Sequence, residues 1–256
     1  MKIPLTKYGW PQVAAFPVII LAAMIFIALF AIKLLPPWAV LFFELILALL
    51  LIWSISFFRD PSRNCPSDEN LLLSPADGKI TEIETVERKE FLGAPAIKIG
   101  IFLSIFNVHI NRAPCSVRVK KIVYKKGQYK NAMNPESGRV NESNELQLIR
   151  TANPTDKLIV KQISGAIARR IVCRTSPGEE LKGGEKFGMI KFGSRTELYV
   201  PVPADTGDLN PDISGSSSRT KDDTQRNQYQ VTCLVKKGDK VKAGLTPLVR
   251  YEKCRD

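Results

Sequence analysis

Two short apolar runs meet in the stretch Phe187-Gly188-Met189-Ile190-Lys191-Phe192-Gly193-Ser194-Arg195-Thr196-Glu197-Leu198-Tyr199-Val200-Pro201. This pattern predicts two strands joined at the dipeptide Gly193-Ser194. A glycine inside a strand pattern indicates a bulge or a close approach of the backbone. The residues alone favour a β-bulge followed by a hydroxyl group. They leave open a second hypothesis, in which Ser194 attacks the carbonyl group of Gly193, since a glycine admits strained backbone geometry before the nucleophile.

Short alternating runs continue on both sides of this stretch and have the period of strands. The predicted strands are Lys79–Val86, Ala96–Ser104, Ser116–Tyr124, Leu146–Arg150, Leu158–Ile163, Ile167–Cys173, Phe187–Phe192, Thr196–Val200, Gln230–Val235 and Pro247–Tyr251. No long amphipathic helix interrupts them. The fold class is therefore predicted to be mainly β, as a compact antiparallel barrel or sandwich. Residues 203–229 are rich in Asp, Ser, Asn, Thr and Gly, and predict a flexible surface loop.

The N-terminal part of the chain is strongly apolar. Residues 13–35 and 38–58 form two runs of about 20 residues, the length at which a helix crosses the hydrocarbon core of a membrane. A signal peptide followed by a core helix is the alternative, but the first run has no small-residue cleavage site. The domain prediction is thus a helical hairpin in residues 1–58 and a second domain in residues 59–256. Glu44 lies inside the second run, and its role stays open.

Positive residues lie both before and after the predicted hairpin, and Lys33 lies near the end of its first run. Lys2 and Lys7 precede the first run, and Arg59 and Arg63 follow the second. Positive residues remain on the cytoplasmic side of a membrane, so we predict an integral protein of the cell membrane with its second domain on the cytoplasmic face.

The composition narrows the classes of partner and cofactor. The chain has 256 residues, a formal net charge of +12, five cysteines and one histidine. A positive charge favours an anionic partner, and the apolar N-terminal part favours an anionic membrane over nucleic acid. The cysteines are widely spaced without a CxxC pair, which argues against both a disulfide scaffold and a zinc site, so no metal is expected.

Five motifs occur in a fixed order along the chain. They are Ser74-Pro75-Ala76-Asp77-Gly78-Lys79, Phe106-Asn107-Val108-His109-Ile110-Asn111-Arg112-Ala113-Pro114, Gly165-Ala166-Ile167-Ala168-Arg169-Arg170, Gly184-Glu185-Lys186-Phe187-Gly188 and Phe192-Gly193-Ser194-Arg195. Together they resemble the phosphatidylserine decarboxylase family in its short, membrane-anchored form. The resemblance extends over roughly residues 55 to 250, and five ordered motifs are far more specific than any single one.

This resemblance implies a self-processing enzyme. The chain would cleave itself between Gly193 and Ser194, and the resulting large and small chains would stay associated. Ser194 would become a pyruvoyl group, a built-in ketone that replaces pyridoxal phosphate (PLP), so no PLP is expected. The implied reaction converts phosphatidylserine into phosphatidylethanolamine and CO2 through a Schiff base with the serine amine. Whether the protein forms a homodimer is left open.

Two alternatives remain. One is the same chemistry on another phosphoserine lipid, such as one with ether-linked chains. The other is a membrane-anchored β domain that binds lipid without catalysis, with Gly193-Ser194 as a bulge.

Three residues are candidates for the catalytic machinery. Ser194 needs activation, since a neutral hydroxyl is a weak nucleophile. His109 is the only histidine, and Asp77 is a carboxylate that could orient it. The residues alone also allow a structural histidine and a turn aspartate. The resemblance implies that Asp77, His109 and Ser194 form the self-processing triad.

Four arginines are candidates for binding the anionic head group of the substrate, because guanidinium groups present forked donors to phosphate and carboxylate. They are Arg112, Arg169, Arg170 and Arg195. A solvated basic face is the alternative.

The chain also departs from the family pattern. Phe106 stands where the long form often has a histidine, which leaves the proton donor in decarboxylation undecided. Ser143 stands where arginine is usual, which weakens any role for Glu142. Ser216 is a competing cleavage site, which we reject because it lies in the polar stretch 203–229.

Overall fold

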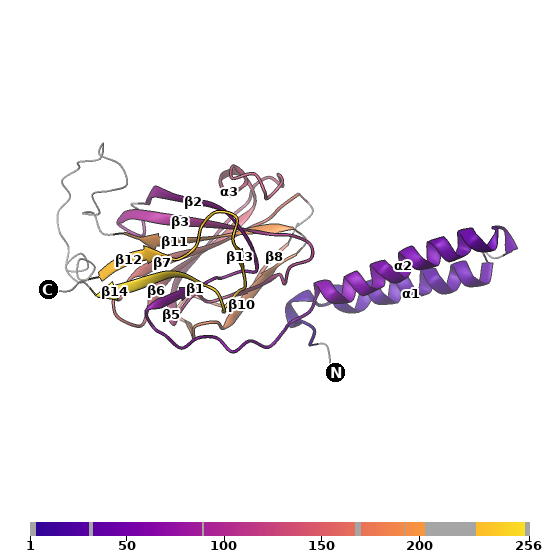
Figure 1. Cartoon of the computed structure of the whole chain (residues 1–256), viewed down its shortest axis with the longest axis horizontal. Coiled ribbons are helices and arrows are strands. Elements are labelled where there is room, and N and C mark those ends of the chain that lie inside the picture. The colour runs from indigo at the N-terminus through magenta and orange to yellow at the C-terminus, as the bar shows by residue number, and fades with distance from the viewer. Residues whose placement is uncertain are drawn as a thin grey trace. The chain divides into compact units, whose positions relative to one another are not determined.

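The fold is taken from a computed structural model of the whole chain (Figure 1). The structure describes residues 4–30, 33–88, 90–166, 170–191, 193–202 and 229–253. It divides into two compact units. The hairpin unit comprises Met1–Ser62 and Ile105–His109, and the β unit comprises Arg63–Ser104 and Ile110–Asp256. Each unit is described by itself.

The hairpin unit consists mainly of two apolar helices, α1 (Gln12–Phe30) and α2 (Pro37–Phe57), after a short 3-10 helix, η1 (Lys7–Gly9). Figure 1 shows α1 and α2 side by side and antiparallel. Pro37 occupies the first turn of α2, where its missing N–H costs no hydrogen bond. Both helices are long and apolar enough to cross a membrane, which confirms the predicted hairpin. Helix α1 is described as far as Phe30; residues 31 and 32 lie outside the described residues, and 33–35 of the predicted run are not α-helical.

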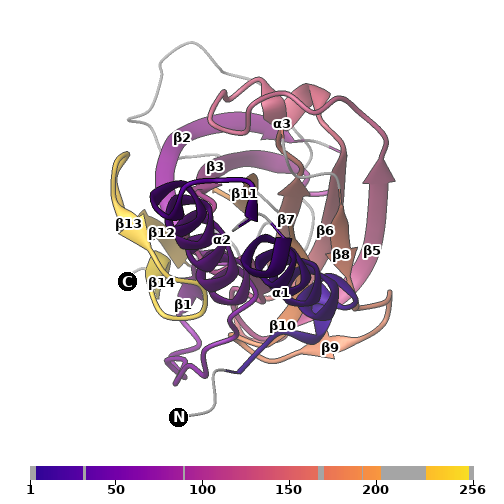
Figure 2. The same ribbon diagram turned by 90° about the vertical axis from the view of Figure 1, so that its right-hand side faces the viewer.

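The β unit is built around one eight-stranded sheet in the order β13-β2-β3-β11-β7-β6-β5-β9, and every pair in it is antiparallel. Two three-stranded sheets, β1-β14-β12 and β4-β10-β8, accompany it. Figure 2 shows β2, β3, β11, β7, β6 and β5 following one curled surface, as in half of a barrel. The predicted mainly β, antiparallel fold is confirmed.

The strands are β1 (Leu71–Leu73), β2 (Gly78–Arg88), β3 (Ala94–Leu103), β4 (Ile110–Arg112), β5 (Val117–Lys125), β6 (Ser143–Arg150), β7 (Lys157–Ile163), β8 (Ile171–Cys173), β9 (Glu180–Leu181), β10 (Lys186–Ile190), β11 (Ser194–Pro201), β12 (Tyr229–Cys233), β13 (Lys240–Val241) and β14 (Pro247–Lys253), with one short helix, α3 (Ser137–Val140).

The end of the predicted loop at residue 229 differs from the structure. Residue Tyr229, placed at the end of the predicted loop, is instead the first residue of β12 and pairs with Lys253. The rest of that loop, 203–228, lies outside the described residues, as do 167–169 of the strand predicted at Ile167–Cys173.

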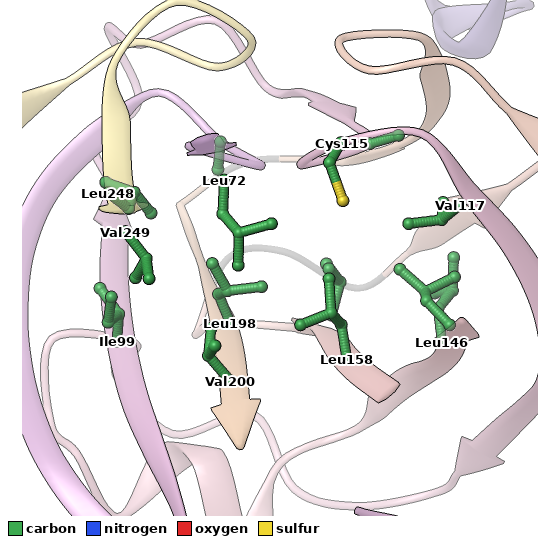
Figure 3. Close-up of a cluster of buried hydrophobic side chains, with 14 of the residues drawn as sticks. Leu72, Ile99, Cys115, Val117, Leu146, Leu158, Leu198, Val200, Leu248 and Val249 are labelled. Atoms are coloured by element: carbon green, nitrogen blue, oxygen red, sulfur yellow. The ribbon is translucent and has the colours of Figure 1, made fainter. Parts of the chain in front are cut away.

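The core lies inside the curl of the large sheet. Leu198 and Val200 of β11 and Ile99 of β3 gather there with Leu72 of β1 and Val249 of β14 (Figure 3). These side chains share one face because alternate residues of a strand point to the same side of its sheet. By the same alternation, Ser194 and Thr196 lie on the core face of β11, and the residues between them lie on the opposite face.

Candidate functional site

Ser194 is the first residue of β11, where it pairs with Leu103 of β3. Its side chain is completely buried. Among the described residues, no hydrogen-bond partner faces its Oγ atom. Buried hydroxyl groups are almost always hydrogen-bonded, and a lone one costs about 1–3 kcal/mol, so this orphan needs an explanation.

The backbone is unusual directly before this hydroxyl. Gly193 has a φ of 66°, in the left-handed region that favours glycine. Gly165 lies against the carbonyl group of Gly193. A Cβ atom added to Gly165 would overlap the carbonyl oxygen and lie 3.1 Å from the carbonyl carbon. Two glycines thus shape the backbone around the peptide bond that precedes Ser194.

Asp77 lies in the turn between β1 and β2 and is tightly held. Its Oδ1 and Oδ2 atoms accept hydrogen bonds from the two terminal nitrogens of Arg63, at 2.6 and 2.8 Å. The backbone N–H of Ala243 also donates to Oδ1, at 2.8 Å. The structure therefore places a fork-shaped cation and a backbone donor on the carboxylate that the sequence assigned to the triad.

His109 belongs to the hairpin unit. Its Nδ1 atom lies 2.9 Å from the carbonyl oxygen of Asn107, which can only accept, so Nδ1 carries the proton. In the neutral ring the basic nitrogen is then Nε2. The ring also packs on that of Phe57, the last residue of α2, with centroids 4.4 Å apart. The next residue, Ile110, begins β4 and pairs with Met189 of β10.

Arg195 follows Ser194 directly, but strand alternation places its side chain on the opposite face of β11. There its Nε donates to Glu197 at 2.7 Å, one terminal nitrogen donates to Thr81 at 2.8 Å, and the other forms an ion pair with Glu82. The side chain is completely buried. The structure does not bring Arg195 to the face that carries Ser194.

Glu197 completes this buried ion cluster. Tyr199 donates its hydroxyl hydrogen to the Oε2 atom of Glu197 at 2.7 Å. Burial raises the pKa of Glu197, but the charge and hydrogen bond of Arg195 and the Tyr199 hydroxyl outweigh it and lower the pKa below its usual 4.5. Glu197 is therefore held as an anion that balances Arg195.

The other predicted head-group arginines lie in different surroundings. Arg112 is buried in β4, and one of its terminal nitrogens donates to the carbonyl oxygen of Gly184 at 2.9 Å. Arg170 is exposed, and its carbonyl oxygen accepts a hydrogen bond from the backbone of Lys191. Arg169 lies outside the described residues.

Lys191 was not singled out from the sequence. It follows β10, three residues before Ser194, and is buried. Burial and then the charge of Arg170 lower its pKa from the usual 10.5. The signal in the sequence was a lysine inside an otherwise apolar run. Within the described ranges, no group of three or more His, Cys, Asp or Glu side chains could hold a metal ion.

The comparison with known families decides which class of protein carries this arrangement. Residues 50–248 match the family model described as phosphatidylserine decarboxylase. The chain belongs to the phosphatidylserine decarboxylase family. The match includes all five motifs quoted above, which confirms the family predicted from them.

Named relatives of the phosphatidylserine decarboxylase family agree over most of the chain. The phosphatidylserine decarboxylase proenzyme of Carboxydothermus hydrogenoformans is 38% identical over 208 residues, 81% of this chain and 84% of the relative. The protein of the same name from Syntrophus aciditrophicus is 37% identical over 244 residues, 95% of this chain and 96% of the relative. The second match includes the hairpin as well as the β unit.

Proposed function

We propose that this chain is a self-processing phosphatidylserine decarboxylase that makes its own pyruvoyl group from Ser194. The observation that supports this most strongly is the buried Oγ of Ser194, which has no hydrogen-bond partner among the described residues and directly follows a glycine with positive φ. A site that keeps a buried hydroxyl without a partner in the described residues, directly after a carbonyl group that two glycines shape, fits a nucleophile better than a structural serine.

The first step is an exchange of bonds at one carbonyl group. The Oγ of Ser194 attacks the carbonyl carbon of Gly193, a C–O bond forms, and the C–N bond between the two residues breaks. The proton that leaves the hydroxyl ends on the freed nitrogen, so the amide becomes an ester. The empty space at the Cα of Gly165 lets the carbonyl group of Gly193 take the position seen in the structure.

The second step divides the chain. Removal of the Cα proton of residue 194 breaks the bond between Cβ and the ester oxygen, which leaves Gly193 as a free carboxylate. The remaining enamine takes a proton at Cβ, and water then releases ammonia and leaves a ketone. The small chain, beginning at residue 194, thereby starts with a pyruvoyl group, which condenses with the substrate amine and takes up the electrons that CO2 leaves behind.

His109 is the proposed base for these proton transfers. Its Nδ1–H is engaged by the carbonyl oxygen of Asn107, which leaves Nε2 as the proton acceptor. Asp77 is the proposed supporting carboxylate, with Arg63 and Ala243 fixing its position. Both roles follow the family motifs and are part of the proposal.

The substrate is proposed to be phosphatidylserine. The phosphate and carboxylate groups of this lipid are anionic and bind cationic side chains. The side chains proposed to bind them are Arg112, Arg169, Arg170 and Lys191. Arg195 is assigned to the stability of the sheet instead, because its donors serve Thr81, Glu82 and Glu197.

The two apolar helices are the proposed membrane anchor, with the β unit on the cytoplasmic face. The positive residues Lys2, Lys7, Arg59 and Arg63 at both ends of the hairpin support this orientation. Protease added to sealed inverted membrane vesicles should digest the β unit, whereas protease added to cells with an intact membrane should leave it uncut.

The two chains produced by cleavage are proposed to stay together. Strand β11 would belong to the small chain, yet it lies between β3 and β7 of the large chain and pairs with both over most of its length. Strand β14, also from the small chain, pairs with β1. Separating the chains would break the middle of the large sheet, so both should elute together in native chromatography.

Denaturing gel electrophoresis of purified wild type and Ser194→Ala tests the proposal. We expect two bands for wild type and one for the variant. Ser137→Ala is the matched control, since Ser137 is also buried and its Oγ has no partner in the part of the chain that the structure describes, but no glycine precedes it. It should give two bands, as should Ser216→Ala. A single band for folded wild type would leave only a membrane-anchored β module.

A further inference from the structure

One buried side chain joins the segments that carry all three proposed catalytic residues. Asn111 in β4 is completely buried. Its Nδ2 atom donates to the Oγ1 of Thr196 in β11, at 3.1 Å, and to the carbonyl oxygen of Pro75, at 3.3 Å. These contacts lie within the β unit and link two different sheets with the turn that precedes β2.

The positions of these three residues in the sequence have a common feature. Thr196 is two residues after Ser194, Pro75 is two residues before Asp77, and Asn111 is two residues after His109. In β11 a spacing of two places both side chains on one face, so Thr196 shares the core face with Ser194. The amide of Asn111 therefore ties its own strand to a side chain two residues after Ser194 and to a backbone carbonyl group two residues before Asp77.

The amide group is held in turn from its other side. The Nε2 of Gln162 donates to the Oδ1 of Asn111 at 2.9 Å and to the carbonyl oxygen of Val172 at 3.3 Å. The Oε1 of Gln162 accepts from Asn144 at 3.2 Å. Gly188 makes room for this approach, because an added Cβ would lie 2.9 Å from the Nε2 of Gln162. The orientation of the Asn111 amide is thereby fixed.

Such a chain of buried amides is costly to desolvate and gives little net stability over apolar packing. Its value lies in geometry, since a fully satisfied buried polar network specifies one arrangement of the elements that it joins. Self-cleavage depends on such geometry, because a misplacement of about 1 Å can slow a positioned reaction by about 100-fold.

We propose that Asn111 is a positioning residue for self-cleavage, acting through its hydrogen bonds to Thr196 and Pro75. The inference rests on the proposed function, since it concerns the cleavage at Ser194. It predicts that removing these bonds slows cleavage more than the accompanying loss of stability explains.

The test follows cleavage of the full chain after a pulse of cell-free synthesis into lipid nanodiscs. The first-order rate constant of self-cleavage is measured at a temperature well below the unfolding temperature of each variant. Thr196→Val removes the hydroxyl that accepts from Asn111 and keeps the side-chain shape, whereas Thr196→Ser keeps the hydroxyl. We expect cleavage to slow about tenfold or more in Thr196→Val and in Asn111→Leu. We expect near wild-type rates in Thr196→Ser.

Tyr251→Phe is the control for stability alone. It removes the buried hydrogen bond of Tyr251 to Asp156, at 3.1 Å, which touches none of the three segments. This variant should cleave at the wild-type rate. Hydroxylamine provides a second measurement, because it cuts the ester that forms after attack by Ser194. It should release little small chain from Thr196→Val, in which less ester forms.

Three outcomes overturn the inference in different ways. If the wild type cleaves itself and both Thr196→Val and Asn111→Leu cleave at the same rate as the wild type, the positioning role is wrong but the proposed function stands. If self-cleavage slows equally in Thr196→Val, Thr196→Ser and Tyr251→Phe, the slowing is an effect of lost stability, and the positioning role is again wrong. An uncut, folded wild type defeats the proposed function and this inference together.

Discussion

Both carboxylate oxygens of Asp77 are held by the two terminal nitrogens of Arg63, at 2.6 and 2.8 Å. The two side chains are 6% and 10% exposed, so water screens the pair weakly. Arg63 also donates to the carbonyl oxygen of Ala243 at 2.6 Å, which ties this pair to the C-terminal part of the chain. The segment that follows α2 in the sequence thus fixes a candidate catalytic carboxylate of the β unit.

This pair gives the first prediction. Arg63→Gln leaves a buried carboxylate without its cation, and we expect the free energy of unfolding to fall by about 3–5 kcal/mol. Arg118→Gln is the control, because the ion pair of Arg118 with Glu180 is 60% exposed on both sides and should contribute less than about 1 kcal/mol. Urea unfolding in detergent measures both. Equal losses in the two variants would contradict the assigned role of Arg63.

Arg195 gives the second prediction. Its replacement in Arg195→Gln strips Glu197 and Glu82 of their shared cation, so we expect stability to fall by about 3 kcal/mol or more. We expect the KM of the cleaved fraction for phosphatidylserine to stay near the wild-type value, since the side chain lies on the face of β11 opposite Ser194. A raised KM with unchanged stability would restore Arg195 to the head-group site.

The ion cluster gives a third prediction, on pH. The folded state lowers the pKa of Glu197 below 4.5, so ionised Glu197 stabilises the fold at pH values above 4.5. That contribution is lost as the pH falls through the lower, folded-state pKa. Glu197→Gln should be less stable than wild type at neutral pH and should lose less stability on acidification. Unfolding curves measured from neutral pH to below 4.5 would reject this if both proteins lost stability equally.

The fourth prediction concerns the carbonyl group of Gly193. In Gly165→Ala the new methyl group would collide with that carbonyl group, so we expect the rate of self-cleavage to fall by about 100-fold. Gly183→Ala is the matched control, because its new Cβ would meet only backbone atoms at 3.5 Å or more. A pulse-chase gel gives both rates. Equal rates would show that the fit between Gly165 and Gly193 is irrelevant to cleavage.

Much of the fold follows from local pattern. The long strands β2, β3, β5 and β11 have eight or more residues, and the sequence predicted a strand within each of them. The short strands β1, β4, β9 and β13 have two or three residues, too few for a period to emerge. They exist because neighbouring chain segments pair with them, which is a tertiary effect.

The candidate site likewise contains residues that local sequence pattern predicts and contacts that it does not. Ser194 and Gly193 could be singled out because both lie at a break in a strand pattern. Arg195 was assigned to the substrate, whereas the alternation of β11 places its side chain on the face opposite Ser194, where it bonds Thr81, Glu82 and Glu197. The bond from Asn111 to Thr196 spans 85 residues, and no local pattern reports such a contact.

The most direct test of the account is intact-mass spectrometry of the folded, purified protein under denaturing conditions. We predict two chains, a large one ending at Gly193 and a small one beginning at residue 194. The small chain should be lighter, by one ammonia, than a chain that begins with serine, and borohydride should reduce its terminal ketone. A single unbroken chain with an unmodified Ser194 in folded protein would contradict the account.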